Sequence, residues 1–85
     1  MPKYEVRITK RASKDIRELS PKMRGKLKAV LEEVLSNTPY EGKPLIGDLK
    51  GNYSLRLNIH DRIVYSIDEK QKIVFVKRAK THYGS

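Results

Sequence analysis

The spacing of apolar residues changes twice along this chain, and these changes limit the folds it can adopt. Over residues 3–9 apolar and polar side chains alternate, which is typical of a strand with one buried face. From 11 to 35 the apolar residues recur every three or four positions, as in helices with one buried stripe. Alternation returns over 53–59, 62–67 and 72–79. The pattern predicts a strand, two helices and three further strands, in that order.

The second helix has the clearest predicted boundaries. Ser20 is a favourable N-cap, and Pro21 suits the first helical position because its missing N–H has no helical partner there. We expect the helix to end at "SNTP", since Pro39 and the residue before it resist helical geometry. The following segment, 38–52, is rich in Gly and Pro and is longer than a simple connection requires, which is typical of a functional loop.

A chain of 85 residues has room for one modest core, so we expect a single domain over 1–85. It contains no Cys, which excludes disulfides and thiolate metal sites. We expect the apolar stripe of the second helix to pack on the apolar face of the sheet. The stripe consists of Leu27, Val30, Leu31 and Val34, and the sheet face carries Leu55, Leu57, Tyr65 and Phe75.

The second and third strands place two arginines where they could meet. In both runs the odd-numbered residues are apolar, so opposed residues that share a face have numbers with an even sum. A two-residue turn at His60 and Asp61 would violate this parity. We therefore expect an odd-length loop or a bulge near 59–61, with Arg56 and Arg62 close together on the face away from the helices. A phosphate site and an ordinary solvated face both fit this arrangement.

The charge balance indicates the partner class. Nineteen Lys and Arg against ten Asp and Glu give a formal charge of +9, which favours nucleic acid or a very acidic protein over a merely solubilising surface. The sequence has no stretch like a signal peptide and no membrane-spanning run, so we expect a cytoplasmic location and no membrane partner.

Several segments resemble one protein family. The order of elements, with "GDLKGNYSLRL", "DRIVYSI" and the terminal "THY", resembles the RelE/ParE superfamily of toxins from bacterial toxin–antitoxin modules. The closing His–Tyr pair is similar to the YoeB/Txe branch. The resemblance implies an α+β fold, β-α-α-β-β-β, with two helices on one face of a small, largely antiparallel four-stranded sheet.

The resemblance also implies an activity and its partners. The activity would be cleavage of messenger RNA in the ribosomal A site, with no metal or other cofactor. The partners would be the messenger RNA, the ribosome and a cognate acidic antitoxin, while operator DNA would be bound only through the antitoxin complex.

RNA cleavage without a metal needs residue types that this chain contains. The RNA's own 2′-hydroxyl attacks the neighbouring phosphorus, a step that requires a base, an acid and cations to offset the phosphorane charge. His82 is the best acid or base, because imidazole titrates near neutral pH. Tyr83 can stack on a base of the RNA. Arg62, and after it Arg56, match arginines of the family that contact phosphate.

The general base is less clear from the sequence. In the YoeB branch a loop glutamate takes this role, but alignment back from the hairpin arginine puts Lys43 in its place. Glu41 is the nearest acidic alternative, and Asp48 is a weaker one. A RelE-like site of several cations would instead use Lys43 and Lys50. The remaining predicted RNA-binding residues are Arg78 and Lys80, whereas His60 is expected to be solvated in the hairpin turn.

Two other functions fit the same fold. A ParE-like toxin would inhibit gyrase and would need no ribonuclease residues, and the terminal His–Tyr pair argues against it. A weakly active or non-catalytic toxin homologue would act as a nucleic-acid-binding partner of its antitoxin. Lys43 at the glutamate position keeps this second alternative open.

Overall fold

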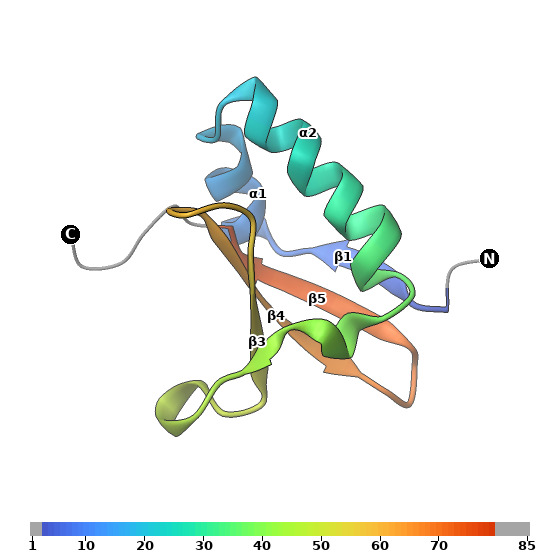
Figure 1. Cartoon of the computed structure of the whole chain (residues 1–85). Coiled ribbons are helices and arrows are strands. Elements are labelled where there is room, and N and C mark those ends of the chain that lie inside the picture. The colour runs from blue at the N-terminus through green and yellow to red at the C-terminus, as the bar shows by residue number, and fades with distance from the viewer. Residues whose placement is uncertain (1–2, 80–85) are drawn as a thin grey trace.

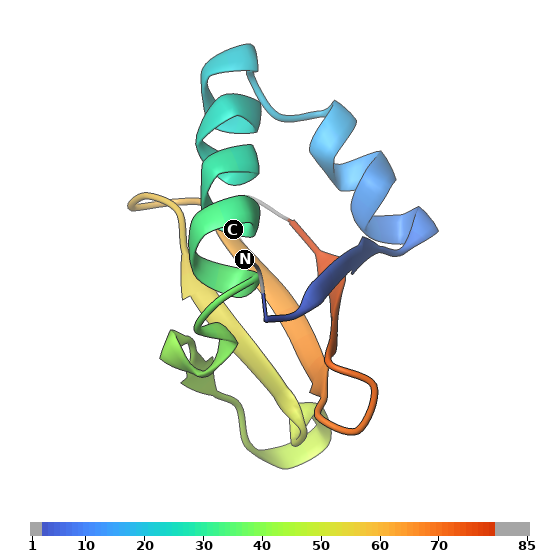
Figure 2. The same ribbon diagram turned by 90° about the vertical axis from the view of Figure 1, so that its right-hand side faces the viewer.

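Two helices lie together over one face of a five-stranded sheet in the computed structural model, which describes residues 3–79 (Figures 1 and 2). This arrangement confirms the predicted α+β class. The helices are α1, Lys10–Arg17, and α2, Pro21–Val30. The strands are β1, Glu5–Ile8; β2, Lys43–Pro44; β3, Asn52–Arg56; β4, Arg62–Asp68; and β5, Ile73–Arg78. Within the described residues, no helix has the length and apolar character needed to cross a bilayer.

The strand order in the sheet is β1-β5-β4-β3-β2, with β1 parallel to β5 and the other neighbours antiparallel. The prediction of four strands was therefore one short. The additional strand is the edge strand β2, in which Lys43 pairs with Ser54. Two residues between a glycine and a longer loop carry no alternating pattern, so only their pairing with β3 identifies them as a strand.

Side-chain caps set the start of both helices. Thr9 Oγ1 accepts a hydrogen bond from the Ala12 amide at 3.1 Å, and Ser20 Oγ accepts one from the Met23 amide at 3.2 Å. The predicted Ser-Pro start of α2 is thus confirmed. The helical path continues through a π-helical turn at Leu31–Leu35 and ends before "SNTP", as predicted.

The core lies between the helices and the odd-numbered face of β3 and β4. Leu27 of α2 is 2 % exposed, and Ile63 and Tyr65 of β4 are fully buried. The other three predicted residues of the α2 stripe are partly buried and pack against this core. The predicted sheet residue Leu55 is also partly buried against the core, and Leu57 is a fully buried member of it. The members of the stripe are Val30, Leu31 and Val34.

Phe75 does not belong to this core face, so its predicted position was wrong. It pairs with Ser66 and therefore lies on the opposite side of the sheet. The turn between β4 and β5 pairs Ile67 with Val74, so the even-numbered residues of β5 share a face with the odd-numbered residues of β4. Val74 and Val76 consequently take the core positions.

The loop between β3 and β4 has the expected odd length, since residues 57–61 separate the two strands. The predicted strand 53–59 nevertheless ends at Arg56, because Asn58 Oδ1 accepts hydrogen bonds from the amides of His60 at 2.8 Å and Asp61 at 2.6 Å. Ile59 is therefore 82 % exposed at the loop tip. His60 is exposed, as expected.

Candidate functional site

Two arginines share one face of the sheet at the end of the β3–β4 hairpin. Arg56 and Arg62 are direct register partners, as the parity of the two strands predicted. Their neighbours along the strands, Leu55 and Ile63, point into the core, so the arginines lie on the face away from the helices. Arg56 is exposed and Arg62 is partly buried. Two guanidinium groups therefore reach the same patch of surface.

An open hollow of about 420 Å³ lies beside this pair. We call it the arginine hollow. It contains four of the residues predicted from the sequence to act in catalysis or RNA binding, brought together from β2, β3, β4 and the turn before β2. The lining residues are Glu41, Lys43, Ser54, Leu55, Arg56 and Arg62.

The segment before β2 carries the carboxylate of this hollow. Pro39–Glu41 form a 3-10 turn, and Thr38 Oγ1 donates a hydrogen bond to Glu41 Oε2 at 3.0 Å. Directly after the turn, Lys43 joins the sheet opposite Ser54. The acidic residue two positions before Lys43 thus lines the same hollow as the two arginines.

The buried side chain of Tyr65 lies against both ends of this turn, at Pro39 and at Gly42. Its hydroxyl donates to the Pro39 carbonyl at 2.7 Å, and burial raises its pKa to about 12, so the hydroxyl stays protonated. A Cβ atom on Gly42 would lie 2.1 Å from the same hydroxyl oxygen. Only glycine therefore allows the chain to pass this close to Tyr65.

A second anchor holds the turn at the surface through Glu69. Tyr40 donates to Glu69 Oε1 at 2.6 Å and Tyr4 donates to the same oxygen at 2.8 Å, while Lys72 forms an ion pair with this carboxylate. The hydrogen bonds from Lys72, Tyr40 and Tyr4 lower the pKa of Glu69 to about 2. No local pattern in the sequence indicates this network, because Tyr4 and Tyr40 are distant from Glu69 in the chain and meet it only when the sheet forms.

Lys50 and Asp48 do not lie in the arginine hollow. Lys50 lines a separate pocket of about 540 Å³ with Tyr40, Tyr53 and Ile67. Asp48 is exposed in the short 3-10 turn Gly47–Leu49. The long Gly/Pro loop therefore extends away from the arginine pair after β2.

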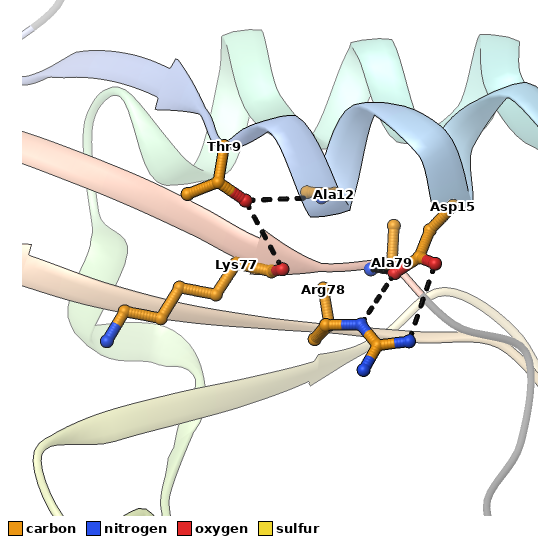
Figure 3. A network of polar contacts seen from close by, with 6 residues as sticks. All are labelled: Thr9, Ala12, Asp15, Lys77, Arg78 and Ala79. Carbon is orange, nitrogen blue, oxygen red and sulfur yellow. Dashed lines mark hydrogen bonds and ion pairs between the residues drawn. The ribbon is translucent and has the colours of Figure 1, made fainter.

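Arg78 is engaged in the fold (Figure 3). Its Nε lies 2.8 Å from Asp15 Oδ2, and the same carboxylate oxygen accepts a hydrogen bond from the Ala79 amide at 3.1 Å. This contact ties the end of β5 to α1. An RNA phosphate at Arg78 would have to compete with Asp15, and the RNA-binding role of Arg78 stays a prediction.

The three remaining predicted site residues, Lys80, His82 and Tyr83, lie outside the described residues. Their roles therefore stay predictions. The strand that precedes them ends with Arg78 paired to Val64, two positions along β4 from Arg62.

The composition of the arginine hollow suits a phosphodiester. Guanidinium groups donate paired hydrogen bonds to phosphate oxygens, and Lys43 adds a compact positive charge. A carboxylate such as Glu41 can accept a proton from a hydroxyl. The open shape gives access to an extended strand of nucleic acid.

Curated relatives share most of this chain, although no family model matches it. Toxin RelE of Mycobacterium tuberculosis is 33% identical over 84 residues, covering 94% of this chain and 86% of the relative. Toxin RelG of the same organism is 37% identical over 79 residues, covering 88% of this chain and 86% of the relative.

Solved structures of toxin–antitoxin complexes have the same fold as this chain. The RelBE2 toxin–antitoxin complex of Mycobacterium tuberculosis matches with a TM-score of 0.87 and 30% identity, covering 99% of this chain and 97% of the matched chain. The YoeB-YefM complex of Staphylococcus aureus matches with a TM-score of 0.75 and 26% identity, covering 94% of this chain and 98% of the matched chain. The chain therefore belongs to the RelE/ParE superfamily and is a toxin of a toxin–antitoxin system.

Proposed function

We propose that this toxin is a metal-independent endoribonuclease that cleaves messenger RNA in the ribosomal A site. The observation that carries the proposal is the arginine hollow, which Arg56, Arg62 and Lys43 line together with one carboxylate, that of Glu41. Three cations in one open hollow suit the charge of a phosphodiester, and a carboxylate among them supplies a proton acceptor.

The reaction would use the nucleophile that RNA itself contains. Glu41 takes the proton of the 2′-hydroxyl, whose oxygen then attacks the adjacent phosphorus. As the new bond forms, Arg56 and Arg62 offset the charge that develops on the phosphorane oxygens. The bond from phosphorus to the 5′-oxygen breaks, and His82 donates a proton to that oxygen. The products would be a 2′,3′-cyclic phosphate and a 5′-hydroxyl.

Other residues of the chain would position the RNA. Lys43 binds the phosphate next to the arginines, and Tyr83 stacks on a neighbouring base, since splayed bases commonly stack on aromatic rings. Two features of the site favour different branches of the superfamily. The terminal His–Tyr pair favours YoeB-like chemistry, whereas Lys43 favours a cation-rich RelE-like site.

The regulatory partner would be a cognate acidic antitoxin. Relatives of this chain have been solved in complexes with antitoxins, which supports the same association here. A net charge of +9 would steer an acidic, flexible segment to the toxin. Operator DNA would then be bound only through the antitoxin.

Ribosomes programmed with a defined message and analysed by primer extension test this proposal. His82→Gln should reduce cleavage by roughly 100–10,000-fold while charge-driven RNA binding is retained. Arg62→Ala should reduce both cleavage and binding, and Glu41→Gln should reduce cleavage. Lys70→Ala, on the exposed turn after β4, is the control and should leave both unchanged.

Three outcomes would overturn the proposal in different ways. Undiminished cleavage by His82→Gln would remove the histidine from the mechanism. Intact messages together with gyrase-dependent DNA breaks would support the ParE-like alternative. Antitoxin binding without cleavage by the unmodified toxin would support a non-catalytic homologue.

A further inference from the structure

Asp15 is the single acidic residue of α1, and its side chain is only 13 % exposed. The charged residues around it on the helix are cations, namely Lys10, Arg11, Lys14 and Arg17. A carboxylate on such a helix could stay in solvent beside these cations. Asp15 instead lies against the end of β5 (Figure 3). The fold therefore uses this carboxylate for a contact between α1 and the last strand.

Two groups at the end of β5 share the Asp15 carboxylate. Arg78 Nε donates to Asp15 Oδ2 at 2.8 Å, and the Ala79 amide donates to the same oxygen at 3.1 Å. Ala79 is 1 % exposed, so its amide lies away from solvent. A buried backbone amide at the end of a strand needs an acceptor, and Asp15 supplies it.

The residue before α1 holds the preceding part of β5. The Thr9 amide donates to the Val76 carbonyl at 3.1 Å, and Thr9 Oγ1 lies 3.4 Å from the Lys77 carbonyl oxygen (Figure 3). Thr9 is also the N-cap of α1. The chain over 76–79 is therefore tied to α1 and its N-cap at both of its ends.

The register between β4 and β5 shifts within this segment. Tyr65 pairs with Val76, but Val64 pairs with Arg78, so Lys77 is an extra residue in β5. Bulges of this kind bend a strand and are frequent next to active sites. Asp15 contacts the two residues directly after the bulge, so it fixes the direction in which the chain leaves the sheet.

The arginine hollow is within reach of a residue that follows this point closely. His82 comes three residues after Ala79, and three residues span at most roughly 11 Å. Val64, the register partner of Arg78, lies two positions from Arg62 on β4, which is roughly 7 Å along the strand. A shift of Ala79 would therefore change where a histidine three residues later can be placed.

We propose that Asp15 is a positioning residue for the cleavage reaction. By holding Arg78 and the Ala79 amide, it fixes the starting point of the C-terminal segment and thereby the placement of His82 at the arginine hollow. Placement matters to proton transfer, because an error of about 1 Å can cost roughly 100-fold in rate. Asp15 has this role only if His82 acts as in the proposed function.

Single-turnover cleavage on programmed ribosomes tests this role with the full-length toxin. Asp15→Ala should reduce the cleavage rate by roughly 10–100-fold. Binding of single-stranded RNA should not weaken, because Asp15 does not line the arginine hollow and its removal takes a competing carboxylate away from Arg78. Alanine is a strong helix former, so α1 should stay folded.

The same change in a His82→Gln background separates positioning from general destabilisation. If Asp15 acts through His82, the double variant should cleave as slowly as His82→Gln alone, since residues that act as a unit are not additive. A loss that came from a smaller folded fraction would instead multiply in both backgrounds. Cleavage is measured at a temperature at which circular dichroism shows every variant to be folded.

Two further variants control for charge and for folding. Glu18→Ala removes the same charge from an exposed position directly after α1 and should leave cleavage unchanged. Asp15→Asn retains an oxygen that can accept from the Ala79 amide but removes the ion pair with Arg78, so it should lose less activity than Asp15→Ala. If Asp15→Ala does not fold, Asp15→Asn takes its place in both backgrounds.

Hydrogen exchange tests the contact with Ala79 without any cleavage. The Ala79 amide should exchange at least about 10-fold faster in Asp15→Ala than in the unmodified toxin, because its acceptor is gone. The Val74 amide, in the middle of β5, is the internal reference and should keep its protection. Unchanged protection of Ala79 would overturn the proposed contact and the role that depends on it.

The cleavage results distinguish failure of this role from failure of the proposed function. Full activity of both Asp15 variants, with His82→Gln impaired, would overturn the role of Asp15 alone. Equal fractional losses in both backgrounds would make Asp15 a purely structural residue. Equal losses of cleavage and RNA binding would assign its effect to RNA binding. Undiminished cleavage by His82→Gln, or none by the unmodified toxin, would overturn the proposed function and this role with it.

Discussion

Arg56 and Arg62 are direct register partners across β3 and β4, so two positive side chains occupy opposed positions on one face of the sheet. Opposed like charges destabilise an antiparallel pair. In the proposed phosphate site the same arrangement would favour binding, because one anion would contact both guanidinium groups. Stability and ligand binding should therefore respond in opposite directions to changes at these positions.

Arg56→Thr should raise the free energy of unfolding by about 0.2–1 kcal/mol at low salt and by less at 0.5 M salt, since salt screens the repulsion between exposed charges. Single-stranded RNA binding should fall in the same variant. Denaturant titration at the two salt concentrations measures the first effect. Arg56→Lys retains the charge and is the matched control. A gain that does not depend on salt would indicate strand propensity rather than repulsion.

Gly25 and Gly42 should respond to alanine with opposite signs. Gly25→Ala should raise the free energy of unfolding by up to about 1 kcal/mol, because the exposed helix position has open space for a methyl group. Gly42→Ala should destabilise the protein, because the new Cβ would lie 2.1 Å from the Tyr65 hydroxyl oxygen. Thermal unfolding of both variants in one buffer gives the comparison. Equal shifts would contradict the path of the chain at residue 42.

Tyr65→Phe should cost about 1–3 kcal/mol, since it leaves the buried Pro39 carbonyl without its hydrogen bond. The turn that carries Glu41 would then loosen, and cleavage should slow more than RNA binding weakens. Tyr53→Phe is the control, because Tyr53 stacks on Tyr65 at a centroid distance of 5.7 Å, whereas the Pro39 carbonyl accepts its hydrogen bond from Tyr65. Parallel losses of cleavage and stability in both variants would argue against a positioning role.

Glu69 should make the protein sensitive to acid. Its pKa is lowered from 4.5 to about 2 by Lys72, Tyr40 and Tyr4, so its stabilising effect is present above about pH 4.5 and is lost as the pH falls toward 2. Glu69→Gln should flatten the dependence of stability on pH in this window. Tyr40→Phe should remove part of the effect. Unfolding midpoints in urea at several pH values test this, and an unchanged pH dependence in Glu69→Gln would show that other carboxylates dominate.

Leu27→Ala should destabilise the protein by about 2–5 kcal/mol, because Leu27 is 2 % exposed between α2 and the sheet and its truncation leaves a cavity. Leu49→Ala removes the same atoms from a side chain that is 52 % exposed and should cost much less. Denaturant titration of the two variants measures the difference. Similar costs at the two positions would place the core elsewhere.

The sequence was informative wherever a signal was local. The start of α2 was predicted from two adjacent residues. Ser20 is the N-cap and Pro21 is the first helical residue, as expected. The parity of the β3 and β4 patterns also predicted an odd loop and the pairing of Arg56 with Arg62, because alternation ties residue number to sheet face.

Tertiary structure decided whatever depended on which segments meet. Phe75 lies opposite the core because the β4–β5 register reverses the parity, and β2 exists only because β3 offers an edge to pair with. The turn at Pro39–Glu41 brings Glu41 into the arginine hollow through contacts with Tyr65 and Glu69, which are 24 to 30 positions away in the chain. Local periodicity determines the elements and their buried faces, whereas register and long-range contacts follow from the packing of the whole chain, which no short window of sequence contains.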